Sequence, residues 1–158
     1  MFNILVLCTG NSARSILAEA IFNRDGAEWV KAYSAGSNPA GMVNPAALRL
    51  LAAKGLPTRG YRSKSWYEFT APGAPRMDLV ITVCNSAASE VCPVWPGAPL
   101  RCHWGMDDPA GAPPDQIGAA FQIAYHHLSI RINAFLALPF ETLDGDSLQA
   151  QLDRIGEG

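Results

Sequence analysis

One short stretch near the start of the chain combines a thiol, a guanidinium and a hydroxyl. Cys8 is followed, after five residues, by Arg14 and then by Ser15. A loop of this length between a strand and a helix can curl so that its backbone N–H groups point inward, and the helix N-terminus adds partial positive charge. Gly10 and Asn11 tolerate the positive φ angles that such a curl needs. The pattern predicts a pocket for a tetrahedral oxyanion, lined by Thr9, Gly10, Asn11, Ser12, Ala13, Arg14 and Ser15.

The same loop predicts a nucleophile. The guanidinium of Arg14 can hold two oxygens of a bound anion. In that field the Cys8 thiolate is stabilised, with Ser15 as a hydroxyl donor, so we expect the pKa of Cys8 to fall. The alternative is a small buried Cys8 with Arg14 on the surface. The position of the pattern between an apolar run and a helix-forming run argues for the chemical interpretation.

The elements that must position this loop follow from the hydrophobic pattern. Apolar runs predict strands, helical spacing and capping residues predict helices, and a segment rich in Pro, Gly and Ser over 56–77 predicts a loop with one helical turn near Trp66–Phe69. The expected strands are Phe2–Leu7, Val30–Ser34, Asp78–Cys84 and Leu100–Trp104. The expected helices begin near Ser15, at Pro45 with Asn44 as the cap, near Ile117 and near Asp144.

This order predicts a single α/β domain over residues 1–158. Its expected architecture is an open, twisted parallel sheet of about four strands with helices on both faces. In such sheets ligands bind outside the carboxyl ends of the strands. Cys8 and Cys84 both lie at predicted carboxyl ends, so we expect the two thiols at the same edge of the sheet.

Composition limits the function classes. The 158 residues hold 12 Lys and Arg against 14 Asp and Glu, which gives a net charge of −2, and 49% of them are hydrophobic. Such a chain is not intrinsically disordered, and it has no global field for nucleic acid or an anionic membrane. No run is long enough for a membrane span, and no secretory signal is recognised. We expect a cytoplasmic protein whose four cysteines stay reduced.

Two motifs resemble those of the low-molecular-weight protein tyrosine phosphatase superfamily, and within it the arsenate reductases built on that fold. They are Ile-Leu-Val-Leu-Cys-Thr-Gly-Asn-Ser-Ala-Arg-Ser at 4–15 and His-Trp-Gly-Met-Asp-Asp-Pro-Ala at 103–110. The resemblance runs from Phe2 to about Phe135. It implies that Asp108, before Pro109, is the general acid that protonates the leaving oxygen. A turn-forming Asp before Pro is the alternative.

The remaining cysteines separate the two branches of this superfamily. Cys84 and Cys92 resemble the reductase branch, which implies attack of Cys8 on arsenic, of Cys84 on the Cys8 sulfur and of Cys92 on Cys84. Seven residues separate Cys84 from Cys92, so the segment must rearrange to bring the Cα atoms within the roughly 7 Å of a disulfide. The small residues Ala110, Gly111 and Ala112 after the Asp-Pro pair suit a free oxyanion. The alternative is a phosphatase that hydrolyses phosphotyrosine or small phosphoesters through a Cys8 phospho-enzyme.

Departures from the family pattern leave the reductant open. Ala13 replaces the usual cysteine, and the spacing from Cys84 to Cys92 is one residue longer than in the commonest thioredoxin-coupled form. The electron donor is therefore thioredoxin, glutaredoxin with glutathione, or a similar thiol. We expect arsenate as substrate, with phosphate or sulfate as mimics, and a monomer.

Lys64 is a further candidate near the loop. Some reductases of this kind use a bound potassium ion there, and the lysine could supply that charge, with Asn11 and Ser34 as neighbours; a solvated loop lysine is the alternative. No metal is expected, because the cysteines lack a close Cys pair of the zinc type. Cys102 is expected to be structural.

Overall fold

The computed structural model describes residues 1–85 and 93–158, so the predicted relay residue Cys92 lies outside the described part of the chain. The strands are β1 (Phe2–Cys8), β2 (Val30–Gly36), β3 (Leu79–Thr82) and β4 (Leu100–His103). The α-helices are α1 (Arg14–Asp25), α2 (Pro45–Ala53), α4 (Ile117–Leu136) and α5 (Gly145–Glu157), and the short 3₁₀ helices are η1 (Trp66–Phe69) and η2 (Pro109–Gly111).

The four strands form one parallel sheet in the order β2-β1-β3-β4. The register pairs Cys8 at the end of β1 with Gly36 at the end of β2, and Thr82 at the end of β3 with His103 at the end of β4. All carboxyl ends therefore meet at one edge, as the sequence predicts for a parallel α/β sheet. The expected fold class is confirmed.

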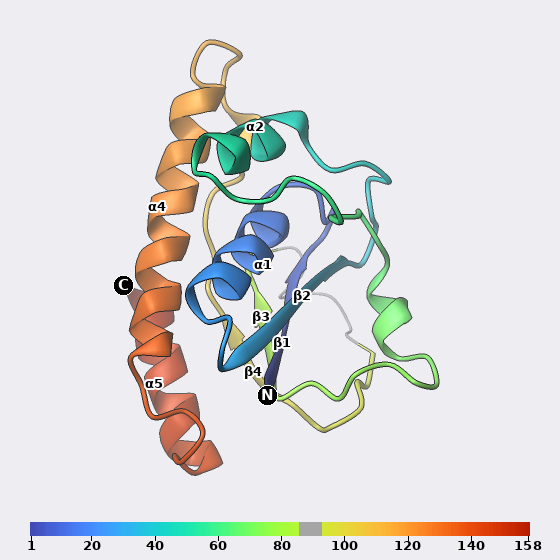
Figure 1. The fold of residues 1–158 in the computed structure, drawn as a ribbon, viewed down its shortest axis with the longest axis vertical. Helices are drawn as coiled ribbons and strands as arrows, with labels where there is room; N and C mark the ends of the chain where they lie inside the picture. Colours follow the sequence, from blue (N-terminus) through green and yellow to red (C-terminus); the bar gives the residue numbers. More distant parts are fainter. Residues whose placement is uncertain (86–92) are drawn as a thin grey trace.

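Alternate residues of β1 serve two separate cores. Ile4 and Val6 belong to the larger cluster, which includes buried residues of α1, α4 and α5. Leu5 and Leu7 belong to the second cluster, which Trp66, Phe69, Met77, Val80 and Trp95 complete. Among the described residues, the second face is thus covered by η1 and by loops. Figure 1 shows α4 along one side of the molecule with α5 beside it, and η1 on the opposite side.

Local signals explain where the helices begin. The Asn44 side chain accepts a hydrogen bond from the Ala46 amide, and Pro45 occupies the first turn of α2. Asp144 caps α5 by accepting from the Ser147 amide. Helix α4 buries a stripe of residues at helical spacing, namely Phe121, Ala124, Leu128, Ile132 and Phe135, while Ile117 at its first turn is half-buried. These boundaries agree with the capping and periodicity rules.

Strand β3 (Leu79–Thr82) is shorter at both ends than the expected run Asp78–Cys84. The Asp78 carboxylate accepts a hydrogen bond from the Asn3 amide. At the other end, Cys84 Sγ accepts from the Thr9 amide at 3.3 Å. The second bond joins the end of β3 to the loop that follows β1, and so places Cys84 at the site.

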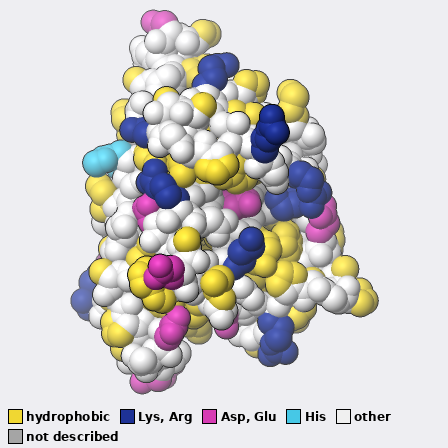
Figure 2. Space-filling view, in the orientation of Figure 1, with side chains coloured by type: hydrophobic (Ala, Val, Ile, Leu, Met, Phe, Trp, Pro, Cys, Tyr) yellow, Lys and Arg dark blue, Asp and Glu magenta, His cyan; other side chains and the backbone are white. Residues whose placement is uncertain are grey.

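Charges of both signs are scattered over the face of the molecule seen in Figure 2. Figure 2 shows Lys and Arg side chains interspersed with Asp and Glu on the face that it presents. A mixed surface of this kind gives no large field of one sign. In the described part of the chain, no helix is both long enough and apolar enough to cross a lipid bilayer.

Candidate active site

The loop between β1 and α1 is fixed by Asn11, whose backbone has a φ of 46°. Its buried amide side chain both accepts and donates a hydrogen bond. Asn11 Oδ1 accepts from the Lys64 amide at 2.9 Å, and Asn11 Nδ2 donates to Ser15 Oγ at 2.9 Å. Asparagine tolerates the left-handed region better than most residues. Asn11 therefore supplies both the turn and the bonds that hold it, as the sequence suggested for the turn.

Helix α1 begins directly after this loop without a side-chain cap. Its N-cap residue is Ala13, which has no oxygen to offer. The first amides of a helix have no intrahelical acceptor, so they must bond to a cap, to water or to a ligand. An uncapped helix start beside a curled loop is a favourable position for an anion.

Gly36 lies underneath the loop at the end of β2. A Cβ atom on this residue would lie 2.4 Å from the Thr9 carbonyl oxygen, 2.9 Å from the Cys8 oxygen and 3.1 Å from Asn11 Cβ. Side chains cannot occupy that space without moving the loop. The close packing of β1 and β2 at this edge thus fixes the curvature of the predicted anion-binding loop at 9–15, called the anion loop below.

Cys8 and Cys84 lie close together at this edge of the sheet: Cys84 Sγ accepts from the amide of Thr9, the residue after Cys8, at 3.3 Å, and hydrogen bonding with Cys84 acts on the pKa of Cys8. Both side chains are buried. The bond with Cys84 favours the protonated form of Cys8 and is the main cause that raises the pKa of Cys8 above its ordinary value; burial raises it further. Arg14 and the Gly10 amide act in the opposite direction but are outweighed. The expected fall of the Cys8 pKa is therefore wrong for this arrangement, because the effect of Cys84 on Cys8 depends on the fold and could not be weighed from the residues alone.

Arg14 reaches from the start of α1 toward the loop that carries Asp108. Its Nη1 donates to the Met106 carbonyl oxygen at 2.9 Å, and its Nη2 lies 3.9 Å from Asp108 Oδ2. The arginine side chain is 13% exposed and the aspartate side chain 50% exposed. Arg14 Nε is buried and has no partner within the described residues. The Nε–H group of the Arg14 guanidinium is thus still available to a ligand. Asp108, the predicted general acid, lies beside Arg14, the predicted anion-binding residue.

Asp108 also organises its own loop. Its Oδ1 accepts from the Ala110 amide at 3.0 Å and caps η2.

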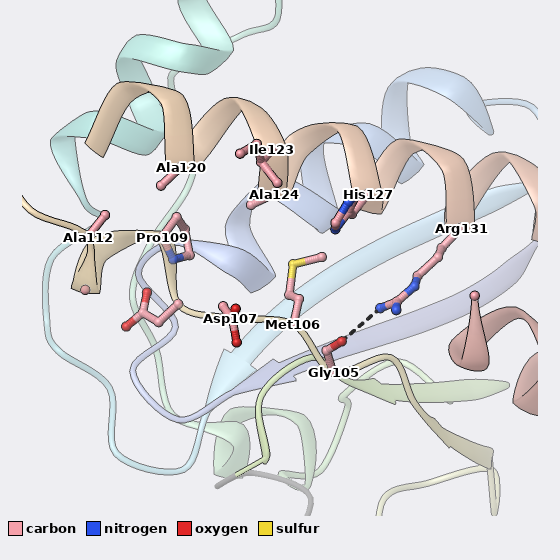
Figure 3. Close-up of a pocket in the computed structure, with 13 residues that line it drawn as sticks. Gly105, Met106, Asp107, Pro109, Ala112, Ala120, Ile123, Ala124, His127 and Arg131 are labelled. Atoms are coloured by element: carbon pink, nitrogen blue, oxygen red, sulfur yellow. Dashed lines mark hydrogen bonds between the residues drawn. The ribbon is translucent and has the colours of Figure 1, made fainter. Parts of the chain in front are cut away.

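Next to Asp108, a pocket of about 570 Å³ opens between the 105–112 segment and α4. Figure 3 shows the loop residues Met106, Asp107 and Pro109 facing Ala124 and His127 of α4 across this pocket. Arg131 donates to the Gly105 oxygen at 3.1 Å and closes the far end.

Lys64 lies in a buried polar cluster at the base of the loop. Its backbone amide holds Asn11, while its Nζ donates to the Arg62 carbonyl oxygen at 3.1 Å. Burial lowers the pKa of Lys64, and the nearby carboxylate of Glu19 opposes this effect. Glu19 accepts from the Ser34 hydroxyl at 2.5 Å. Burial raises the pKa of Glu19, although the Ser34 hydroxyl and Lys64 lower it.

The other candidates lie apart from this site or outside the described chain. Cys102 packs in the larger core, and burial raises its pKa, in agreement with a structural role. Cys92 falls in the segment 86–92, which the structure does not describe. Within residues 1–85 and 93–158, no group of three His, Cys, Asp or Glu side chains is arranged to hold a metal ion.

Sequence reasoning missed two groups at this edge. His103 bridges β3 and the residue after Cys84: its Nδ1 lies 2.7 Å from Thr82 Oγ1, and its Nε2 lies 2.9 Å from Asn85 Oδ1. Glu19 was also missed, because a single Glu in a predicted amphipathic helix is typical of the solvent-exposed face. The role of His103 is visible only once the strand register is known, because the pairing of β3 with β4 places His103 opposite Thr82.

The chain belongs to the low molecular weight phosphotyrosine protein phosphatase family, whose model matches residues 3–146. Among its relatives, an arsenate reductase of Halalkalibacterium halodurans is 38% identical over 135 residues, which cover 84% of this chain and 93% of that protein.

Solved structures give the same fold. The arsenate reductase from Archaeoglobus fulgidus is 29% identical, with a TM-score of 0.62 over 82% of this chain and 98% of that one. The tyrosine phosphatase Wzb from Escherichia coli K30, in complex with sulphate, is 25% identical, with a TM-score of 0.63 over 83% of this chain and 96% of that one. The fold thus accommodates both branches that the sequence motifs suggested.

Proposed function

We propose that this chain is an arsenate reductase in which residues 1–158 act as one domain. The observation that carries the proposal is the position of Cys84, whose Sγ accepts from the amide of Thr9, the residue after Cys8, at 3.3 Å, beside the uncapped start of α1. Hydrolysis of a phosphoester needs one nucleophilic thiol, whereas reduction needs a second thiol within reach of the first. The names of the relatives, arsenate reductase at 38% identity over most of the chain, support the same choice.

The first step takes place in the anion loop. Arsenate binds to the loop amides, from Thr9 to Ser15, and to the guanidinium of Arg14. The bound arsenate takes the proton of Cys8, the resulting thiolate attacks arsenic, and Asp108 protonates the oxygen that leaves as water. A bound dianion withdraws Arg14 from the Met106 carbonyl and from Asp108, which leaves the carboxyl group near the departing oxygen.

The next steps transfer the electrons. The Cys84 thiolate attacks the Cys8 sulfur, the sulfur–arsenic bond breaks, and its electron pair leaves with arsenic as arsenite. Two thiols have then been oxidised to a Cys8–Cys84 disulfide, which balances the reduction of As(V) to As(III). Cys92 attacks Cys84 and frees Cys8, and a Cys84–Cys92 disulfide remains.

An external thiol closes the cycle. We propose thioredoxin, or glutaredoxin with glutathione, as the partner that reduces the Cys84–Cys92 bond. Such donors are kept reduced in the cytoplasm, so we place the reaction there, with a monomer as the working unit. Phosphate and sulfate, which share the shape and charge of arsenate, are expected to compete for the loop.

Lys64 supplies the charge that a potassium ion would otherwise bring to the base of the loop. This part of the proposal is supported by the burial of the ammonium near the Glu19 carboxylate and by the bond from its backbone to Asn11. The wild type should then reduce arsenate equally fast in potassium and in sodium buffers. A clear stimulation by potassium would exclude this role for Lys64.

The proposed function is tested by arsenate-dependent NADPH oxidation in the presence of thioredoxin and thioredoxin reductase, and in parallel with glutaredoxin, glutathione and glutathione reductase. The wild type should be active in at least one system, and Cys8→Ser, Cys84→Ser and Cys92→Ser should each abolish the activity. Cys102→Ser is the matched control and should retain it. If Cys84→Ser and Cys92→Ser kept full activity, the relay would be wrong.

A further inference from the structure

The imidazole of His103 lies between two fixed points beside the relay. Thr82 Oγ1 is 2.7 Å from Nδ1, and Asn85 Oδ1 is 2.9 Å from Nε2. A carbonyl oxygen only accepts, so Nε2 must carry the proton and donate to Asn85. In the neutral ring, Nδ1 then accepts from the Thr82 hydroxyl. The two hydrogen bonds run in one direction, from the last residue of β3 through the ring to Asn85.

Asn85 is the residue directly after Cys84. The position of Cys84 is thus set from two sides: its Sγ accepts from the Thr9 amide at 3.3 Å, and its chain neighbour is held by His103. Because the parallel register places His103 opposite Thr82, the imidazole is anchored on the rigid part of the sheet. The hydrogen bond to Asn85 therefore comes from a residue of the central sheet, His103 in β4.

His103 and Asn85 are both exposed at this edge, and the backbone at Gly105 passes close to their hydrogen bond. A Cβ atom on Gly105 would lie 2.5 Å from His103 Nε2 and 3.1 Å from Asn85 Oδ1. Gly105 continues into Met106, whose carbonyl oxygen receives Arg14. The loop that carries the acid thus packs against the hydrogen bond that holds the residue after Cys84.

We propose that His103 is a positioning residue for the second step of the reaction: through Asn85 it holds Cys84 where its sulfur can attack Cys8. This inference rests on the proposed function, since it concerns the attack of Cys84 on the Cys8 sulfur, in which arsenite leaves with the bonding electron pair. Anion binding and the first attack by Cys8 do not depend on it. The side-chain partners of His103, Thr82 and Asn85, lie outside the 9–15 loop proposed to bind the anion.

The test isolates that step in a Cys92→Ser background, where the reaction stops at the Cys8–Cys84 disulfide. Arsenate is mixed with the reduced protein without external thiol, and arsenite and the disulfide are measured over time by quenching and mass spectrometry. His103→Ala and Asn85→Ala should each slow disulfide formation about tenfold, the loss expected for one hydrogen bond. The double variant should be no slower than either single one, because both remove the same bond.

Two variants and one substrate serve as controls. Asn85→Asp keeps an acceptor oxygen and should restore the rate, whereas His126→Ala removes an exposed histidine of α4 and should not change it. Hydrolysis of p-nitrophenyl phosphate uses the loop and Asp108 without Cys84, so it should fall less than twofold in His103→Ala. Nitrogen NMR of the reduced protein should find the Nε2–H tautomer of His103.

Several outcomes would overturn the inference. A wild-type rate in His103→Ala, additive losses in the double variant, or a parallel loss of p-nitrophenyl phosphate hydrolysis would each exclude the positioning role. Failure of the proposed function is a separate result: the chain with His103 intact would then release no arsenite and form no Cys8–Cys84 bond.

Discussion

The pKa of the Cys8 thiol depends more on Cys84 and on burial than on the groups of the anion loop. Contact with Cys84 and burial raise its pKa, while Arg14 and the Gly10 amide lower it. The raised pKa favours the protonated thiol of Cys8 when no anion is bound. A buried protonated thiol is a poor target for adventitious oxidation, because the thiolate is the reactive form.

Replacement of Cys84 by alanine should lower the pKa of Cys8, since it removes the largest cause of the upward shift. The rate of Cys8 alkylation by iodoacetamide, followed from pH 6 to 10 by mass spectrometry, should then rise at lower pH than in the wild type. The sign follows because a lower pKa means more thiolate at a given pH. Cys102→Ala should leave the profile unchanged. A shift of the Cys84→Ala profile to higher pH would contradict the assigned cause.

Asp108 and Asp107 form a natural pair of test and control. Asp108→Asn should slow arsenate turnover by about 10²–10⁴-fold, the usual contribution of a positioned general acid. Its affinity for phosphate, measured by calorimetry, should be retained or increased, because a negative charge 3.9 Å from Arg14 is lost. Asp107→Asn should change turnover less than threefold. A larger effect at Asp107 would reassign the acid.

At the scale of elements, the site depends on how closely β1, β2 and the loop pack. Gly36→Ala places a methyl group 2.4 Å from the Thr9 oxygen, and overpacking of this kind costs about 1–3 kcal/mol. Gly118→Ala is the control: nothing lies within 4 Å of its Cβ position in α4, so it should stabilise by up to about 1 kcal/mol. Urea denaturation measures both, and equal free energies of unfolding would refute the argument.

The elements could be predicted from the sequence because their signals are local. The apolar run of β1, the Asn44–Pro45 start of α2 and the stripe of α4 follow from capping and periodicity. The meeting of Cys8 and Cys84 also followed, since parallel strands end at a common edge. The raised Cys8 pKa and the His103 bonds could not be foreseen, because both depend on contacts between residues 18 or more positions apart.

At the scale of the molecule, a net charge of −2 is no obstacle to an anionic substrate. In the proposed function the anion is attracted by local groups, which include the uncapped start of α1, the loop amides and Arg14. Local donors of this kind bind an anion at short range and are less screened by salt than a surface field. The four-stranded scaffold brings the loop, the acid and the second thiol to one edge.

Anion binding should therefore stabilise the whole fold. Phosphate at 100 times its Kd adds about 2.7 kcal/mol to the free energy of unfolding when one site is filled. Thermal unfolding should move upward with phosphate in the wild type and in Arg59→Ala, which removes an exposed arginine. Arg14→Ala should abolish the shift. An equal shift in Arg14→Ala would locate the anion elsewhere.

The central claim is that two thiols of this chain supply the electrons for one arsenate. The direct measurement is a single turnover: fully reduced wild-type protein is mixed with excess arsenate in the absence of any other thiol. The account predicts one arsenite per chain and a Cys84–Cys92 disulfide, with Cys8 and Cys102 still free, read by arsenic speciation and mass spectrometry of the alkylated digest. Four free thiols and no arsenite, in a protein that still hydrolyses p-nitrophenyl phosphate, would contradict it.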